Sequence, residues 1–180
     1  MEYDIQMLLD KRKACLSDMA SHFKQFFEDA NYLQKQQRKI KKHVIKRHRD
    51  LDEVLRGAGF YLIATDCPTG GTNPCTLMVG DGLPVVYRGH SSNVRERVES
   101  HLFCDQYRSK DSGRRFKVCM KLNGGNINID NSALNDKQWV VVTHSMSGST
   151  SLLREAAEMG CRSGRAGRRC SPACCELEDE

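Results

Sequence analysis

The first glycine of the chain is Gly57, and no proline precedes it. Glycine and proline are the residues that most often interrupt regular structure, so residues 1–56 are expected to be helical throughout. A heptad frame that starts at Leu9 places the following apolar side chains on one seam: Leu16, Met19, Phe23, Phe26, Ala30, Leu33, Ile40, Val44, Leu51 and Val54. This spacing favours either a coiled coil that joins two copies of the chain as a homodimer or a helical hairpin folded onto the rest of the chain. Both alternatives stay open at this point.

The last part of this helical region is strongly basic. Residues 35–49 contain eight cations and no acid: Lys35, Arg38, Lys39, Lys41, Lys42, Lys46, Arg47 and Arg49. A solvated helix face usually carries both signs of charge, and this one carries a single sign. The run therefore favours contact with the phosphates of a nucleic-acid backbone, with an ordinary solvated face as the alternative.

The overall charge has the same sign. The net charge of the 180 residues is +5, and four acids lie among the last five residues, so the first 175 residues carry +9. Such an excess favours polyanionic partners. A hydrophobic content of 39% with 28% charged residues is typical of a globular protein rather than a disordered one.

The compartment is inferred from what the chain lacks. No apolar run is long enough to cross a bilayer, and the first residues lack the pattern of a secretory signal, so a cytoplasmic protein with no membrane partner is expected. The nine cysteines are scattered or crowded near the end, which favours reduced thiols. Residues 161–180, rich in cysteine and without periodicity, are expected to be a disordered tail.

After Gly57 the pattern changes to short apolar runs. Residues 59–66, 83–89 and 139–146 are typical of strands, and residues 93–102 and 148–160 are typical of helices. The order of these elements predicts an α+β domain over residues 57–160, with a small antiparallel three-stranded sheet flanked by helices. The helical region 1–56 would precede this domain.

The corner between the second strand and its helix is rich in groups that bind anions. Arg97 and His101 are four residues apart, so they share one helix face and reach the same object. An apolar stripe lies next to them at Val94, Val98 and Leu102. Arg97 would then lie at the edge of the core, close to the strand that carries Tyr87, where its guanidinium suits a phosphate or carboxylate.

Several of these residues agree with one known family. Gly59-Phe60-Tyr61, then Val86-Tyr87-Arg88-Gly89, then Asn93, Arg97 and His101 resemble the GIY-YIG nuclease module. The resemblance covers residues 57–160 and is carried by the joint spacing of these residues rather than by either tripeptide. It implies hydrolysis of DNA phosphodiester bonds with the help of one divalent metal ion, Mg²⁺ or Mn²⁺.

The resemblance also implies roles for individual side chains. Tyr61 would be the general base or would position water, Tyr87 would help to position the nucleophile, and His90 would support it. Arg97 would stabilise charge on the scissile phosphate, and His101 would contact a phosphate oxygen or the attacking group. Glu155 would be the metal ligand, with Glu158 as its competitor on the same helix.

Arg88 stands where the family usually has an aliphatic residue. A buried arginine needs a partner, so its side chain is expected at the rim of the site, in contact with DNA. This departure keeps two further interpretations open. One is a nucleic-acid-binding module whose catalytic centre has decayed, and the other is a coiled-coil adaptor whose α+β domain binds protein.

Overall fold

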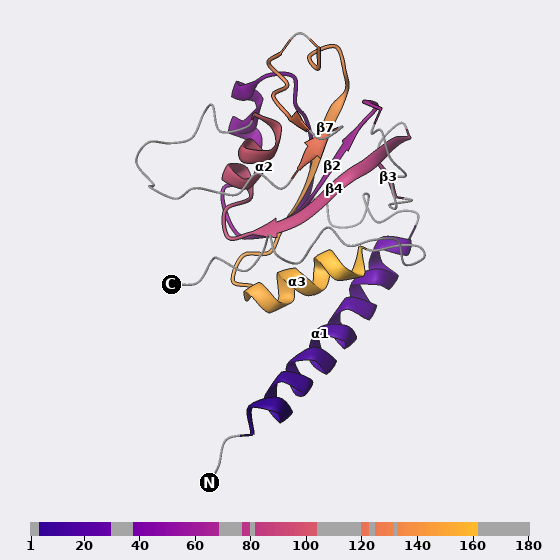
Figure 1. The fold of residues 1–180 in the computed structure, drawn as a ribbon, viewed down its shortest axis with the longest axis vertical. Helices are drawn as coiled ribbons and strands as arrows, with labels where there is room; N and C mark the ends of the chain where they lie inside the picture. Colours follow the sequence, from indigo (N-terminus) through magenta and orange to yellow (C-terminus); the bar gives the residue numbers. More distant parts are fainter. Residues whose placement is uncertain are drawn as a thin grey trace.

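The computed structural model describes residues 4–29, 38–68, 77–79, 82–103, 120–122, 125–131 and 133–161. Figure 1 shows the elements along the chain. In order they are α1 (Ile5–Glu28), β1 (Ile40–Val44), the short 3-10 helix η1 (His48–Glu53), β2 (Gly59–Thr65), β3 (Met78–Val79), β4 (Leu83–Ser91), α2 (Val94–Leu102), β5 (Lys121–Leu122), β6 (Gly125–Asn126), β7 (Trp139–Ser145) and α3 (Ser151–Gly160). The Cys-rich residues 162–180 and Lys35 lie outside the described residues.

The core of the fold is a curled antiparallel sheet of five strands in the order β1-β7-β2-β4-β3. Its three central strands, β7, β2 and β4, are the three that the sequence predicts. The α+β class is therefore confirmed, whereas the predicted three-stranded sheet is too small. Two further strands, which the sequence does not predict, lie at the two borders of the sheet. β1 pairs with β7, and the two-residue β3 pairs with the start of β4.

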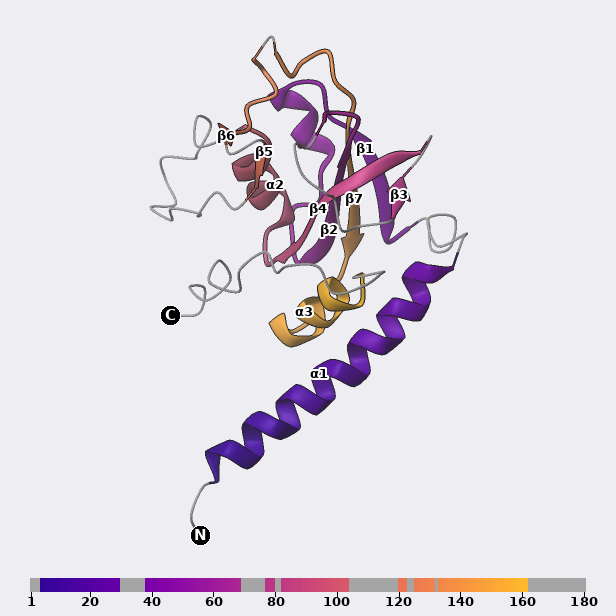
Figure 2. The ribbon, with the colours of Figure 1, turned by 45° about the vertical axis from the view of Figure 1, so that its right-hand side comes forward.

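The sheet lies between two layers (Figure 2). Every residue of β2 is buried, and its side chains alternate between two hydrophobic clusters. Tyr61 and Ile63 pack with α2 and η1 on one face. Phe60 and Leu62 pack with α1 and α3 on the other face. A strand covered on both sides explains why residues 59–65 read as a nearly continuous apolar run.

The expectation of one continuous helix through residue 56 is wrong, because a strand follows α1 and only the short 3-10 helix η1 comes after it up to residue 56. Residues Ile40–Val44 form β1, and all five pair with β7. The pairing continues at both ends, where Ser145 N donates to Lys39 O at 2.8 Å and Ile45 N donates to Trp139 O at 2.9 Å. These hydrogen bonds and the burial of Ile40 and Ile45 outweigh the helix propensity of the lysines.

The helix α1 packs against its own chain through its C-terminal half. Asp4 caps the helix by accepting from Met7 N at 3.1 Å. Near the other end, Gly160 of α3 lets the two helices approach closely, because a Cβ there would lie 2.5 Å from Ala20 O. Phe27 then reaches the sheet, with its ring 5.3 Å from that of Phe60.

The N-terminal half of α1 projects away from the sheet (Figure 1). Four large apolar side chains on its first two turns are exposed: Ile5, Met7, Leu8 and Leu9. Within the part of the chain that the structure describes, no helix combines the length and the apolar character needed to cross a membrane.

Candidate functional site

The second half of β4, which we call the β4 edge, lies near one border of the sheet among the described strands. β4 pairs with β2 along its length, and on its other side β3 pairs with Leu83 and Pro84, while Val85 N donates to Leu77 O at 3.0 Å. Side chains beyond that point alternate between the two faces of the sheet. Tyr87 lies on the face that α2 covers, whereas Arg88 and His90 stand opposite Leu62 and Phe60 on the face that α3 covers.

A buried hydrogen bond lies on the α2 face of this edge. The hydroxyl of Tyr61 is 2.9 Å from Nε2 of His101, and both side chains are 0% exposed. The half-buried ring of Tyr87 packs against this pair, with its centre 4.4 Å from that of His101. The structure thus brings together three of the residues that the sequence predicts for the site.

The close approach of Tyr61 explains why position 89 is a glycine. It stands opposite Tyr61 in the strand register, and the phenol ring lies over it. A Cβ at this position would lie 2.7 Å from the Tyr61 hydroxyl and 2.9 Å from the ring carbon that carries it. Only a residue without a side chain leaves the hydroxyl where it reaches His101.

Arg97 connects the two faces of the edge. Burial, and then the guanidinium of Arg97, lower the pKa of His101 to about 3. Burial, and then the guanidinium groups of Arg154 and Arg97, lower the pKa of His90 to about 4. Arg97 on α2 therefore acts on an imidazole on either side of the strand. Both imidazoles are neutral near pH 7, and each offers a nitrogen lone pair.

The α3 face of the edge carries an acid and an arginine. Nε2 of His90 lies 3.7 Å from a carboxylate oxygen of Glu158. Because His90 is neutral, this contact is polar rather than an ion pair. Arg154, one turn before Glu158, is 9% exposed, and its Nη1 donates to Ser149 O at 2.7 Å. Its Nε is buried without a hydrogen-bond partner among the described residues.

Arg154 was missed by the sequence interpretation. It lies on the helix that carries the two candidate metal-binding acids, Glu155 and Glu158. The available signal was its spacing, since Arg154 and Glu158 are four residues apart and therefore share one face of α3.

The two acids of α3 point to different neighbours. The carboxylate of Glu155 lies 3.2 Å from Nη2 of Arg12 on α1. The carboxylate of Glu158 lies beside His90 on β4. Of the two candidates for the metal ligand, the structure therefore places Glu158, and not Glu155, at the edge of β4.

Arg88 and the basic run lie in different places. Arg88 is half-buried on the α3 face, and its Nε is buried without a partner among the described residues, so the expectation of a side chain free at the rim holds only in part. The described cations of the run, from Arg38 to Arg49, lie on and around β1 and η1. Two strands, β7 and β2, separate β1 from β4, so these cations do not belong to the cluster at the β4 edge.

The donor set fits a hard cation that is held mainly by its substrate. Among the described residues, no group of three or more His, Cys, Asp or Glu side chains could hold a metal ion. Magnesium needs oxygen ligands, and it is commonly bound through one or two carboxylates, substrate phosphates and several waters. Glu158, whose side chain is 23% exposed, would supply the carboxylate.

The β4 edge thus gathers a guanidinium, a phenol, two neutral imidazoles and a carboxylate. The guanidinium can bind an oxyanion, and the carboxylate can ligate a cation. The half-buried phenol of Tyr87 and the imidazole of His90 can orient water or accept its proton, whereas the buried imidazole of His101 is engaged with Tyr61. None of the family models, curated proteins and solved structures with which the chain was compared matches it.

Proposed function

We propose that this chain is a metal-dependent endonuclease that hydrolyses phosphodiester bonds of DNA at the β4 edge. The observation that carries the proposal is the cluster in which the hydroxyl of Tyr61 lies 2.9 Å from Nε2 of His101 and the ring of Tyr87 packs 4.4 Å from that of His101. Arg97, one turn before His101 on α2, adds a cation beside this cluster, and a cation attracts an anion. The GIY-YIG resemblance and the positive charge of the chain favour a nucleic-acid phosphate as that anion.

In this proposal Arg97 binds the non-bridging oxygens of the scissile phosphate and stabilises the charge that develops on them. Tyr87, the half-buried phenol on the α2 face, positions the phosphate. His90, on the α3 face, accepts a proton from the attacking water as the water oxygen bonds to phosphorus. The bond from phosphorus to the leaving oxygen then breaks, and the leaving oxygen takes a proton from solvent.

Tyr61 and His101 receive a positioning role. Both are 0% exposed, so neither touches the substrate in this arrangement. Their hydrogen bond fixes the wall against which Tyr87 packs. This assignment moves direct contact with the nucleophile from Tyr61, which the resemblance implies, to His90.

Glu158 is proposed as the residue that holds Mg²⁺ or Mn²⁺. When bound, the metal ion would neutralise charge on the phosphate. Glu155 is instead assigned to the contact between α3 and α1, through Arg12.

The test is a plasmid-nicking assay with and without magnesium. Arg97→Ala is expected to abolish nicking, whereas Arg56→Ala is expected to retain it. Arg56 is a suitable control because it lies outside the cluster and its side chain is 69% exposed. The proposal fails if the wild-type chain does not cut DNA with either metal, or if both arginine variants cut equally well.

A matched pair of acids tests the metal ligand. Glu158→Gln and Glu155→Gln remove one negative charge each, three residues apart on one helix. Glu158→Gln is expected to abolish nicking and Glu155→Gln to leave it nearly unchanged. The opposite result would restore Glu155 as the ligand and contradict the assignment from geometry.

A second function is favoured by the complete burial of Tyr61 and His101. A tyrosine and histidine that serve only as core residues would suit a nucleic-acid-binding module without catalysis. That function predicts retention of a labelled duplex with no cleavage at any metal concentration.

A further inference from the structure

The edge strand β1 carries an unusual density of exposed cations. From Arg38 to Arg47 the chain has six basic residues, and all six are exposed: Arg38, Lys39, Lys41, Lys42, Lys46 and Arg47. We call these six residues the basic edge. β1 pairs with β7 on one side only, so its outer side forms the border of the sheet among the described strands.

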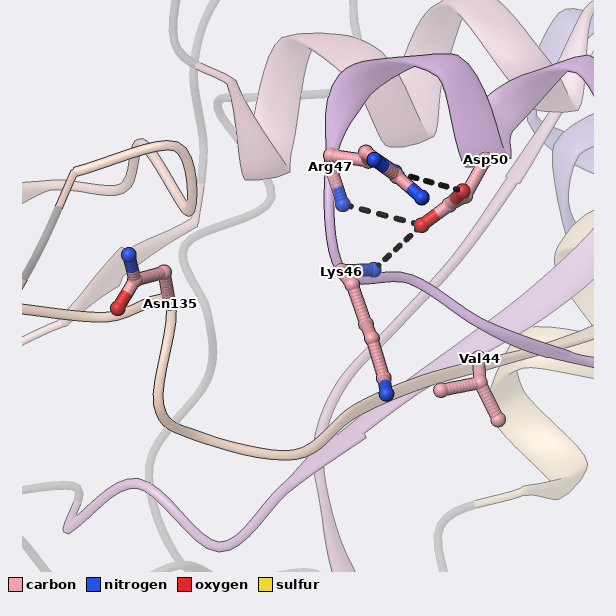
Figure 3. A pocket seen from close by; sticks show the side chains of 5 residues that line it. All are labelled: Val44, Lys46, Arg47, Asp50 and Asn135. Atoms are coloured by element: carbon pink, nitrogen blue, oxygen red, sulfur yellow. Dashed lines mark hydrogen bonds and ion pairs between the residues drawn. The ribbon is translucent and has the colours of Figure 1, made fainter.

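The positive charge of the basic edge is little compensated within the described residues. Arg47 is the one member with an ion pair there, 3.8 Å from Asp50. The carboxylate of Asp50 also accepts the backbone N–H groups of Lys46 at 2.8 Å and Arg47 at 3.1 Å. Figure 3 shows the ammonium of Lys46 pointing away from Asp50. Asp50 therefore caps the first turn of η1 and leaves the charge of Lys46 available to a ligand.

Open hollows flank the strand. One, of about 620 Å³, is lined by Lys46, Arg47 and Asp50 together with Val44 and Asn135 (Figure 3). A second, of about 500 Å³, is lined by Lys41, Lys42, His43 and Val44 together with the acids Asp50 and Glu53. The register puts Lys41 on the face of the sheet that α2 covers and Lys42 on the opposite face. Lysine side chains thus extend from both faces of the border strand, with Asp50 and Glu53 as the acids beside them.

We propose that the basic edge binds the phosphate backbone of duplex DNA, and that it holds the substrate across the sheet from the β4 edge. The choice of DNA rests on the proposed function, whereas the binding surface rests on the charges described above. The seven residues from Arg38 to Val44 span six steps of about 3.3 Å, or roughly 20 Å. That length matches the rise of about six base pairs.

The basic edge and the reaction centre lie within the footprint of one duplex. β1 and β4 are three strand spacings apart, which is roughly 14 Å. Phosphate contacts fix the register of a duplex without reading its sequence, so the basic edge would position DNA rather than select a site.

A simpler role for these lysines is protection of the sheet border. Charged residues on edge strands prevent pairing with other chains. One or two charges within the strand serve that purpose, and either sign would do. The basic edge has a single sign and continues beyond β1 at Arg38, Lys39, Lys46 and Arg47. This extension favours anion binding over protection alone.

The test measures the affinity of the full-length chain for a fluorescein-labelled duplex at several salt concentrations, in EDTA so that no cleavage occurs. Lys41→Ala/Lys42→Ala is expected to lower the slope of log K against log salt by about 2, because each phosphate contact contributes about 0.9. The matched control, Lys11→Ala/Lys13→Ala, removes the same charge from exposed positions on α1 and is expected to keep the wild-type slope.

The outcomes separate the two proposals. Equal slopes in the wild type and both double variants overturn the basic edge as a DNA-binding surface, even if the wild type cuts DNA. A lower slope only in Lys41→Ala/Lys42→Ala supports it, even if no cleavage is ever seen. If that variant aggregates, Arg38→Ala/Lys39→Ala, outside the strand, is measured in its place, and an unchanged slope there also overturns the proposal.

Discussion

Replacing Gly89 by alanine tests whether the hydrogen bond between Tyr61 and His101 depends on the absence of a side chain on β4. The new Cβ would lie 2.7 Å from the Tyr61 hydroxyl, whereas carbon prefers contacts of about 3.5 Å. The phenol must therefore move by nearly 1 Å. Its bond to His101 is 2.9 Å long, so this shift stretches it beyond the range of a hydrogen bond.

The expected cost has two parts. Overpacking a core costs about 1–3 kcal/mol, and a lost hydrogen bond adds about 1 kcal/mol. For a chain of this size each kcal/mol lowers Tm by about 2–4 °C. Gly89→Ala is therefore expected to lower Tm by about 4–16 °C in thermal unfolding followed by circular dichroism.

Two further variants make the measurement specific. Tyr61→Phe removes the atom nearest to the new Cβ, so Gly89→Ala should cost about 1 kcal/mol less in that background. Gly125→Ala is the control, because its Cβ would meet its nearest neighbour at an ordinary 3.6 Å and should change the free energy of unfolding by less than about 0.5 kcal/mol. A wild-type Tm for Gly89→Ala, or an equal cost in both backgrounds, would refute the reasoning.

Three other perturbations have definite expected outcomes. Gly160→Ala should lower the free energy of unfolding in urea by about 1–3 kcal/mol, because its Cβ would lie 2.5 Å from Ala20 O; an unchanged midpoint would contradict the close contact of α1 and α3. Burial lowers the pKa of His144 to about 4, so its contribution to stability is complete above about pH 6.5 and is lost as the pH falls toward 4. His144→Leu should therefore flatten the decline of stability between pH 6.5 and 4 by up to about 1.4 kcal/mol per pH unit, and a slope equal to the wild type's would disprove the effect. Arg12→Ala breaks an exposed ion pair with Glu155 and should change stability by less than about 1 kcal/mol; a larger loss of Tm would mean that this pair holds α1 in place.

The central strands and the helices α2 and α3 could be predicted because their signals are local. The apolar run at 59–65, the stripe at Val94, Val98 and Leu102, and the cap at Thr150 depend on near neighbours in the sequence. β1 could not be predicted in this way. Ile40 and Val44 are four residues apart, as on a helix, and only the backbone of β7 makes them a strand.

The candidate site, too, was predictable only where it depends on local spacing in the sequence. Spacing and resemblance selected Tyr61, Tyr87 and His101, and these three side chains lie together. The same reasoning preferred Glu155 to Glu158. Helical periodicity places two acids three residues apart close together on one side of a helix, and α3 is contacted by both α1 and β4. Which acid meets which neighbour depends on tertiary packing, which local patterns do not encode.

The uneven docking of α1 has a consequence for how this helix melts. Its 24 residues extend about 36 Å, and burial is concentrated near its C-terminal end, at Ala20 and Phe27. Isolated helices shorter than about 12–15 residues are marginal in water, so the turns around Leu8 and Leu9 depend on the docked turns to remain helical. α1 is therefore one continuous helix whose N-terminal turns are expected to unfold at a lower free energy than its docked C-terminal turns. Amide protons should exchange quickly at its start and slowly near Phe27, along a single unbroken ladder of hydrogen bonds.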